Sequence, residues 1–130
     1  IAPAVRLVKG AYREPRDVAL ASRREVDARY VELADRLLAH VPDGAFPVLG
    51  THDLRIVGTV RRRAAALALP REALEVHMLY GIRAADQRAL AASGCVVRTL
   101  VSYGSAWWAW YMRRLAEKPG ENVWMVLRNI

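Results

Sequence analysis

Short apolar runs alternate along the chain with longer stretches in which apolar residues recur every three or four positions. The runs occupy residues 5–9, 46–50, 74–78 and 96–101. Each run is apolar enough to be buried on both faces, as the strands of parallel sheets are. This alternation predicts parallel strands joined by crossover helices, which is the arrangement of α/β proteins.

The longer stretches predict helices over residues 15–40, 53–68 and 84–93. In the first of them, an apolar stripe is formed by Val18, Val26, Tyr30, Leu33 and Leu37. Asp53 is placed to cap the second helix, and Gly94 is placed to end the third in a left-handed conformation. A further helix is expected over residues 104–117.

The chain as a whole, at 130 residues, has the size of one domain or of part of one. Four successive βα units can form half of an eight-unit barrel or most of an open doubly wound sheet, and periodicity does not choose between them. No apolar run approaches the ~20 residues of a membrane span. Because the chain opens without methionine or a targeting peptide, we expect a truncated start. Cys95 is the only cysteine, which excludes an internal disulfide and favours a reducing, cytoplasmic setting.

Polar or glycine-bearing clusters follow the apolar runs, at residues 9–12, 51–53, 80–83 and 102–104. In both candidate folds the ligand site lies at the C-terminal ends of the strands. Lys9 followed by Gly10 could contact a phosphate, although a turn is the commoner role of such a pair. Thr51, His52 and Asp53 combine a hydroxyl, an imidazole and a carboxylate, a set that also suits a helix cap.

Several common kinds of site lack their sequence signals. No G-x-G-x-x-G or Walker motif follows a strand, which argues against a Rossmann or P-loop nucleotide site. The three histidines are scattered, so we expect no metal site. A net charge of +7 suits nucleic acid, anionic lipid or a phosphate-bearing cofactor. A nucleic-acid-binding module is the weakest of these hypotheses, because the arginines are spread over several helices and no nucleic-acid motif is present.

The pair Arg113 and Arg114 lies on the expected helix over residues 104–117, which is rich in tryptophan. Two guanidinium groups can hold one carboxylate through paired hydrogen bonds if that helix overhangs a pocket. A solvated basic face is the alternative, and it is the interpretation that we favour for residues 61–63.

Four ordered motifs cover nearly the whole chain: RLVKGAY at residues 6–12, THD at 51–53, EVHMLYGIR at 75–83 and SYGSAWWAWYMRRLAEKPGEN at 102–122. The last is the most specific, since it joins a strand end in Tyr-Gly to an aromatic-rich helix and to Arg-Arg-Leu followed by an acidic residue. In order and spacing, the four motifs resemble the proline dehydrogenase family.

The resemblance implies a distorted (βα)8 barrel of the TIM type. Residues 1–130 would be the C-terminal half of this barrel domain, namely its last four βα units and final helix, with FAD bound over the strand ends. Arg6 would be a catalytic residue near the flavin N5 edge and would also contact the cofactor. The other implied contacts to FAD are Val8, Lys9, Gly10, Ala11, Thr51, His52, Asp53 and Glu117.

The same resemblance implies a substrate and a reaction. Arg113 and Arg114 would clamp the carboxylate of L-proline, while Leu79 and Leu100 would line the pocket for its ring. The implied activity, in proline catabolism, is oxidation of L-proline to 1-pyrroline-5-carboxylate, with a hydride passing to FAD N5 and electrons passing on to a quinone. Such an enzyme would be cytoplasmic or peripheral at the inner membrane.

Three residues depart from the family pattern. Leu100 stands where the family usually has tyrosine, Ser102 where it has proline and His77 where it has glutamine. The change at Leu100 makes hydroxyproline or another cyclic amino acid an alternative substrate. The first four βα units are outside this sequence, so exposed strand edges predict instability, aggregation or a partner, which would be the missing N-terminal half or a second copy. A non-catalytic fragment that binds FAD weakly is the second hypothesis.

Overall fold

The computed structural model describes residues 3–9, 15, 17–105, 107–109 and 112. Within these residues, strands and helices alternate in the order β1 (Ala4–Val8), α1 (Arg23–Ala39), β2 (Phe46–Gly50), α2 (Leu54–Ala66), β3 (Glu75–Leu79), α3 (Ala84–Ala92) and β4 (Val96–Leu100). A short 3₁₀ helix, Arg71–Ala73, precedes β3. Every strand boundary lies within one residue of the predicted boundary, so the predicted β/α alternation is confirmed.

The four strands form one parallel sheet in the order β1-β2-β3-β4. Each strand pairs with the strand that precedes it in the chain, so the order does not reverse. A doubly wound sheet reverses its order at a switch point, whereas a barrel adds each new strand beside the last one. The strand order therefore favours the barrel over the doubly wound alternative.

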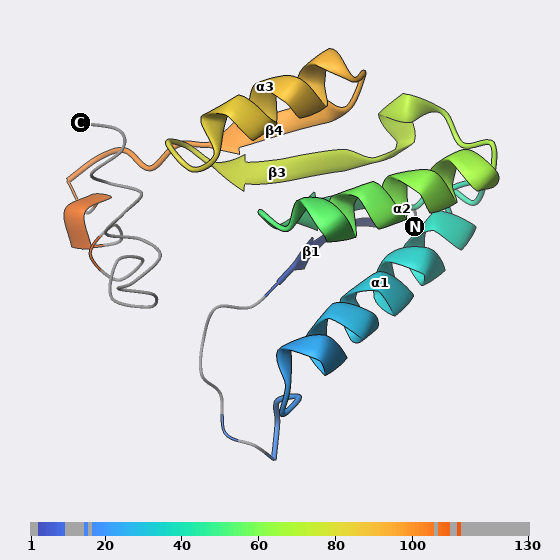
Figure 1. Cartoon of the computed structure of the whole chain (residues 1–130), viewed down its shortest axis with the longest axis horizontal. Coiled ribbons are helices and arrows are strands. Elements are labelled where there is room, and N and C mark those ends of the chain that lie inside the picture. Colours follow the sequence, from blue (N-terminus) through green and yellow to red (C-terminus); the bar gives the residue numbers. More distant parts are fainter. Residues whose placement is uncertain (1–2, 10–14, 16, 106, 110–111, 113–130) are drawn as a thin grey trace.

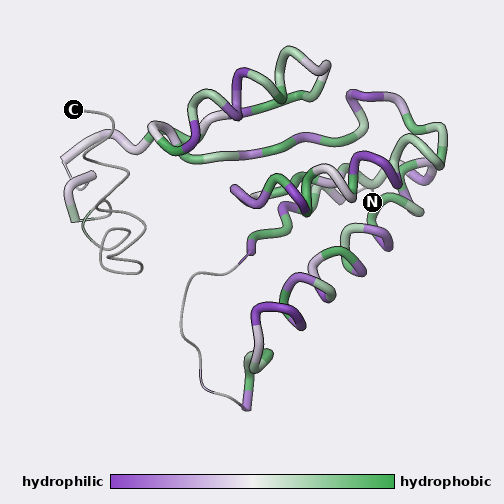
Figure 2. Tube along the Cα trace, in the orientation of Figure 1, coloured by the Kyte–Doolittle hydropathy of each residue, from purple (hydrophilic) through white to green (hydrophobic). Residues whose placement is uncertain are grey.

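The helices α1 and α2 lie side by side on one face of the sheet (Figure 1). This is the expected result when successive right-handed crossovers run in one direction along a sheet. The core lies between these helices and the central strands, and its most buried members are Ala34, Leu38, Leu49, Val57, Val60, Val76 and Met78. Hydrophilic and hydrophobic residues alternate along both helices, as expected for helices with one buried side (Figure 2).

The helix α1 begins later than predicted because Ser22 caps it. The Ser22 hydroxyl accepts a hydrogen bond from the Glu25 backbone N–H at 3.2 Å, and the Glu25 carboxylate accepts one from the Ser22 N–H at 2.9 Å. This reciprocal pair is a capping box, which satisfies donors that a helix start leaves free. The predicted start at residue 15 was wrong, and Val18 lies outside the helix with a side chain that is 72% exposed.

The buried side of α1 is formed by Tyr30, Ala34 and Leu38. Their spacing of four residues places them on one side of the helix, which is rotated relative to the predicted stripe through Leu33 and Leu37. The Tyr30 hydroxyl donates a hydrogen bond to the Leu7 carbonyl oxygen at 2.9 Å, and burial raises the pKa of Tyr30. This bond fastens α1 to β1.

The α3–β4 unit is sparsely buried compared with β2 and β3. The helix α3 has no buried residue, and three of the five residues of β4 are exposed. Polar contacts instead hold α3 in place, since the Gln87 side-chain amide donates to the carbonyl oxygens of Leu79 at 3.0 Å and Ile82 at 2.7 Å. Gly94 follows α3 with a φ of 77°, which confirms the predicted left-handed position.

The predicted helix over residues 104–117 is described only in part. Residues 107–109 and 112 are helical, while residues 106, 110–111 and 113–117 lie outside the described residues. Of the helices in the described part of the chain, none combines the length and hydropathy that would be needed to cross a bilayer.

Candidate functional site

The two faces of the sheet differ in chemistry. Leu7, Leu49, Val76 and Met78 contact the helices, because they belong to the core or pack against it. Since alternate side chains of a strand point to opposite faces, their neighbours occupy the other face, which we call the open face. Its residues are Ala4, Arg6, Val8, Phe46, Val48, Gly50, Glu75, His77, Leu79, Val96, Arg98 and Leu100. The prediction that the strands are buried on both faces holds for the middle of β2, but it is wrong for β1 and β4, because exposed residues lie on this face of both strands.

An ion-pair network joins the C-terminal end of β1 to α1 and α2. The Lys9 ammonium lies 2.5 Å from a carboxylate oxygen of Asp27 and 3.0 Å from one of Asp53. The Lys9 side chain is only 17% exposed, so water screens these pairs weakly. Two carboxylates thus balance the charge of Lys9, and its role as a contact to a cofactor phosphate stays a prediction.

Asp53 caps α2 in addition to binding Lys9. One oxygen of its carboxylate accepts hydrogen bonds from the backbone N–H groups of Arg55 at 3.1 Å and Ile56 at 3.5 Å. Burial raises the pKa of Asp53, but hydrogen bonds from Lys9 and Arg55 outweigh this effect and hold the pKa well below its usual range. Asp53 is therefore ionised at neutral pH, and its predicted role as a helix cap is confirmed.

His52 lies at the C-terminal edge of the sheet with one ring nitrogen engaged. Its Nε2 accepts a hydrogen bond from the Leu79 backbone N–H at 3.3 Å, so the neutral ring carries its proton on Nδ1. Burial, together with the smaller effect of the nearby Arg83, lowers the pKa of His52 to about 4. Among the described residues, the buried Nδ1 has no hydrogen-bond partner. The ring is thus neutral at physiological pH and offers a donor for a ligand acceptor.

The depressed pKa of His52 predicts a loss of stability between pH 6.5 and pH 4. In this window the unfolded chain binds a proton at His52 that the folded chain does not bind, so the free energy of unfolding falls as the pH falls. Because the ring is partly exposed, we expect His52 to contribute a loss of about 1 kcal/mol between pH 7 and pH 5. Urea unfolding at the two pH values measures this loss.

The variant His52→Gln should lose less stability than the wild type over the same pH change. The matched control is His40→Gln, which alters an exposed histidine at the end of α1 and should retain the loss of stability that His52 causes. An equal pH dependence in the wild type and in His52→Gln would contradict the burial of a neutral imidazole.

Leu79 and Leu100 are direct partners in the register of β3 and β4. Both lie on the open face at the last position of their strands, where Leu100 is 46% exposed. Side chains of in-register neighbours on one face of a sheet are in contact range. The two leucines, predicted separately as contacts of a substrate ring, therefore come together as one apolar surface.

Deeper on the open face, a polar cluster joins β3 to β4. Glu75 accepts two hydrogen bonds from the Arg98 guanidinium, at 2.7 Å and 2.6 Å, and one hydrogen bond from His77 at 2.9 Å. The paired bonds from Arg98 and the bond from His77 lower the pKa of Glu75 to about 2. This cluster was not predicted from the sequence. The sequence did contain a signal for it, namely two polar residues at positions 75 and 77 of an apolar strand, since that spacing places both side chains on one face.

Of the remaining predicted site residues, the structure describes three, and the others lie outside the described residues. Arg6 and Val8 lie on the open face of β1, where both side chains are exposed. Thr51 is buried at the end of β2, and its hydroxyl accepts a hydrogen bond from the Asp53 N–H at 3.1 Å. The predictions for Gly10, Ala11, Arg113, Arg114 and Glu117 fall outside the described residues.

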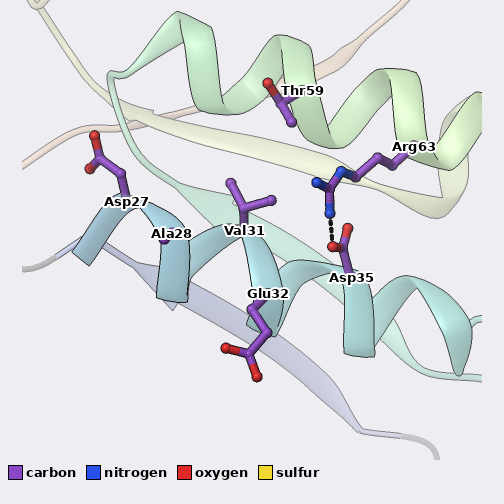
Figure 3. Close-up of a pocket in the computed structure, with 7 residues that line it drawn as sticks. All are labelled: Asp27, Ala28, Val31, Glu32, Asp35, Thr59 and Arg63. Carbon is purple, nitrogen blue, oxygen red and sulfur yellow. Dashed lines mark ion pairs between the residues drawn. The ribbon is translucent and has the colours of Figure 1, made fainter. Parts of the chain in front are cut away.

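A groove runs between α1 and α2, away from the open face (Figure 3). Seven residues line it, namely Asp27, Ala28, Val31, Glu32, Asp35, Thr59 and Arg63. An ion pair between Arg63 and Asp35 joins the two helices across it. Arg62 and Arg63 are exposed, as predicted for a solvated basic face, while Arg61 donates hydrogen bonds to Ser93.

Comparisons with known proteins agree with the resemblance seen in the motifs. The family model for proline dehydrogenase matches residues 2–123. The chain is 40% identical over 124 residues to a proline dehydrogenase of Deinococcus radiodurans, covering 95% of this chain and 39% of that protein. It is 38% identical over 128 residues to proline dehydrogenase 1 of Bacillus subtilis, covering 98% of this chain and 41% of that protein.

A solved structure gives the same result for the fold. The chain superposes on a crystal structure of proline utilization A from Bdellovibrio bacteriovorus, a protein that was inactivated by N-propargylglycine. The TM-score is 0.79 and the sequence identity is 28%, and the match covers 92% of this chain and 14% of that chain. Together with the strand order, this match confirms the α/β fold of the barrel type. The chain spans only 39% and 41% of the length of the two curated relatives described above. Since the family model covers residues 2–123 of the 130, the chain belongs to the proline dehydrogenase family.

Proposed function

We propose that this chain is part of a FAD-dependent dehydrogenase that oxidises L-proline to 1-pyrroline-5-carboxylate. One observation carries the proposal beyond family membership. The residues inferred to contact cofactor and substrate come from separate strands, yet Thr51, His52, Leu79 and Leu100 lie at the same edge of one sheet. In barrel enzymes this edge holds the active site.

The described residues of the open face fit a flat cofactor. At Gly50 the face carries no side chain that would project toward a ligand. The neighbouring strand also requires this glycine, because an added Cβ would lie 3.1 Å from the Leu7 carbonyl oxygen and 3.2 Å from the Val8 side chain. The buried Nδ1 of His52 supplies a donor that the described protein groups do not use. When bound, FAD would supply the hydride acceptor at N5 and a route for electrons to a quinone.

The chain's own residues would orient the substrate and keep water away from it. Leu79 and Leu100 would contact the apolar ring of proline. Arg113 and Arg114 would hold its carboxylate through paired hydrogen bonds, which fixes the ring in one orientation. Arg6, on the open face of β1, would place a positive charge near the reacting edge of the cofactor. The same proposal includes a cytoplasmic location, with electrons passing to a quinone at the inner membrane.

A visible absorption spectrum tests the proposed function. Purified protein is mixed with FAD, separated from free flavin and treated with L-proline without oxygen. We expect a flavin spectrum to be retained and then to bleach with L-proline but not with D-proline. If no flavin is retained, the chain by itself is not the enzyme, and a non-catalytic fragment becomes the better description.

A related cyclic amino acid is a second candidate substrate, and Leu100 is the observation that favours it. Leucine is shorter than the tyrosine usual in this family, so it leaves room for a substituent on the ring. We expect Leu100→Tyr to lower kcat/KM for hydroxyproline on the order of tenfold more than for proline, because the added phenol fills that room. Steady-state assays with both substrates measure the ratio.

The control for this substitution is Val101→Tyr. It adds the same phenol one residue beyond the end of β4, at a side chain that is 53% exposed. The preference for proline over hydroxyproline should not change in this variant. An unchanged preference in Leu100→Tyr itself would remove Leu100 from the proposed pocket.

A further inference from the structure

The polar cluster of the open face has a fixed pattern of donors and acceptors. The Glu75 side chain is only 10% exposed, while the Arg98 side chain that binds it is 65% exposed. The guanidinium uses Nε and Nη2 for the two carboxylate oxygens. His77 then brings its Nε2 to the same oxygen that accepts from Arg98 Nε. Glu75 is thus bound by Arg98 of β4 and by His77 of its own strand, β3.

This pattern determines which nitrogen of His77 carries the proton. An ionised carboxylate can only accept hydrogen bonds, so the group facing it must donate. The neutral His77 ring therefore has its proton on Nε2 and a lone pair on Nδ1. The imidazole side chain is 24% exposed, so it is accessible from the open face. On the other side of β3, the residue of β2 that pairs with His77 is Gly50, which has no side chain.

We propose that Glu75 is a positioning residue that locks His77 in the Nε2–H tautomer, so that Nδ1 accepts a hydrogen bond from an N–H of the bound flavin. This inference rests on the proposed function. The pyrimidine edge of a flavin has an imide N–H between two carbonyl oxygens, and His77 and Arg98 offer the complementary acceptor and donor. Arg98 can still donate through Nη1, because Glu75 occupies its other two positions. Arg6 is the other charged group of the open face.

Nitrogen-15 NMR of the histidine rings tests the tautomer without any flavin. At pH 8.5, where free histidine is neutral, we expect a single Nε2–H tautomer for His77 in the wild type. Glu75→Gln should convert this signal to a mixture, because a side-chain amide can present either a donor or an acceptor. The matched control is Glu72→Gln, which removes an exposed carboxylate three residues away and should leave the tautomer unchanged. A mixed tautomer in the wild type, or an unchanged one in folded Glu75→Gln, would overturn the proposal.

Flavin binding tests the acceptor. The probes are riboflavin and its N3-methyl derivative, in which the imide N–H is replaced. We expect methylation to weaken binding to the wild type on the order of tenfold, and to make little difference in His77→Ala. If riboflavin binds and methylation has the same effect in both proteins, the role of His77 is overturned while the proposed function stands. If neither flavin binds, the contact between His77 and the flavin is overturned, while the proposed function is decided by the FAD spectrum described above.

Discussion

The variant Leu49→Ala is expected to lower the free energy of unfolding by about 3 kcal/mol. Leu49 is the fourth residue of β2, has no exposed surface and packs in the core that α1 and α2 form against the sheet. Removing its side chain deletes apolar contacts on both sides and leaves a cavity that rigid neighbours cannot fill. The midpoint of urea unfolding, followed by circular dichroism, measures the change.

A second leucine provides the control. Leu67 follows α2 with a side chain that is 53% exposed, so Leu67→Ala should cost less than about 1 kcal/mol. Equal effects of the two substitutions would mean that the core does not lie between the helices and β2. This outcome would also undermine the separation of the sheet into a core face and an open face.

The second large effect is expected at the proposed carboxylate clamp. Exchanging both Arg113 and Arg114 for lysine should raise KM for L-proline by at least about 100-fold, with FAD still bound. Lysine keeps the positive charge but cannot form the paired hydrogen bonds of a guanidinium, so the loss would report on geometry rather than on charge. Flavin bleaching at increasing proline concentrations measures KM.

The control for the clamp is Arg88→Lys on α3, since Arg88 is exposed there. Its KM and flavin content should match those of the wild type. If the double variant instead retains its KM and loses flavin, then Arg113 and Arg114 act on the cofactor and not on the substrate. This distinction requires both readouts from the same sample.

The sequence was sufficient for the parts of the fold that depend on local patterns. The strand boundaries followed from the apolar runs, and Asp53 and Gly94 marked helix ends because both positions have local backbone requirements. The start of α1 was missed because the residues before Ser22 continue an apolar spacing that resembles a helix. A capping box at Ser22 and Glu25 was the stronger signal, since it satisfies backbone donors directly.

The two faces of the sheet were harder to predict. A strand such as β1 is mostly apolar by composition, yet its side chains alternate between a covered face and an open one. Polar residues at positions 75 and 77 marked the open face of β3, but the apolar composition of the strands as a whole obscured this signal. The cluster of Glu75, His77 and Arg98 was not foreseen because Arg98 reaches it from another strand.

The sparse burial of the α3–β4 unit has a consequence for local stability. The core residues of β2 and β3 would have to be exposed before those strands could open, but α3 contributes no buried residue and β4 is exposed over three of its five residues. Regions with few buried contacts open at lower free energy than the rest of a protein. Backbone amides of this unit should therefore exchange with solvent deuterium before those of β2 and β3. Each opening would also release Arg98 from Glu75, so fluctuations of one helix would reach the electrostatics of the open face.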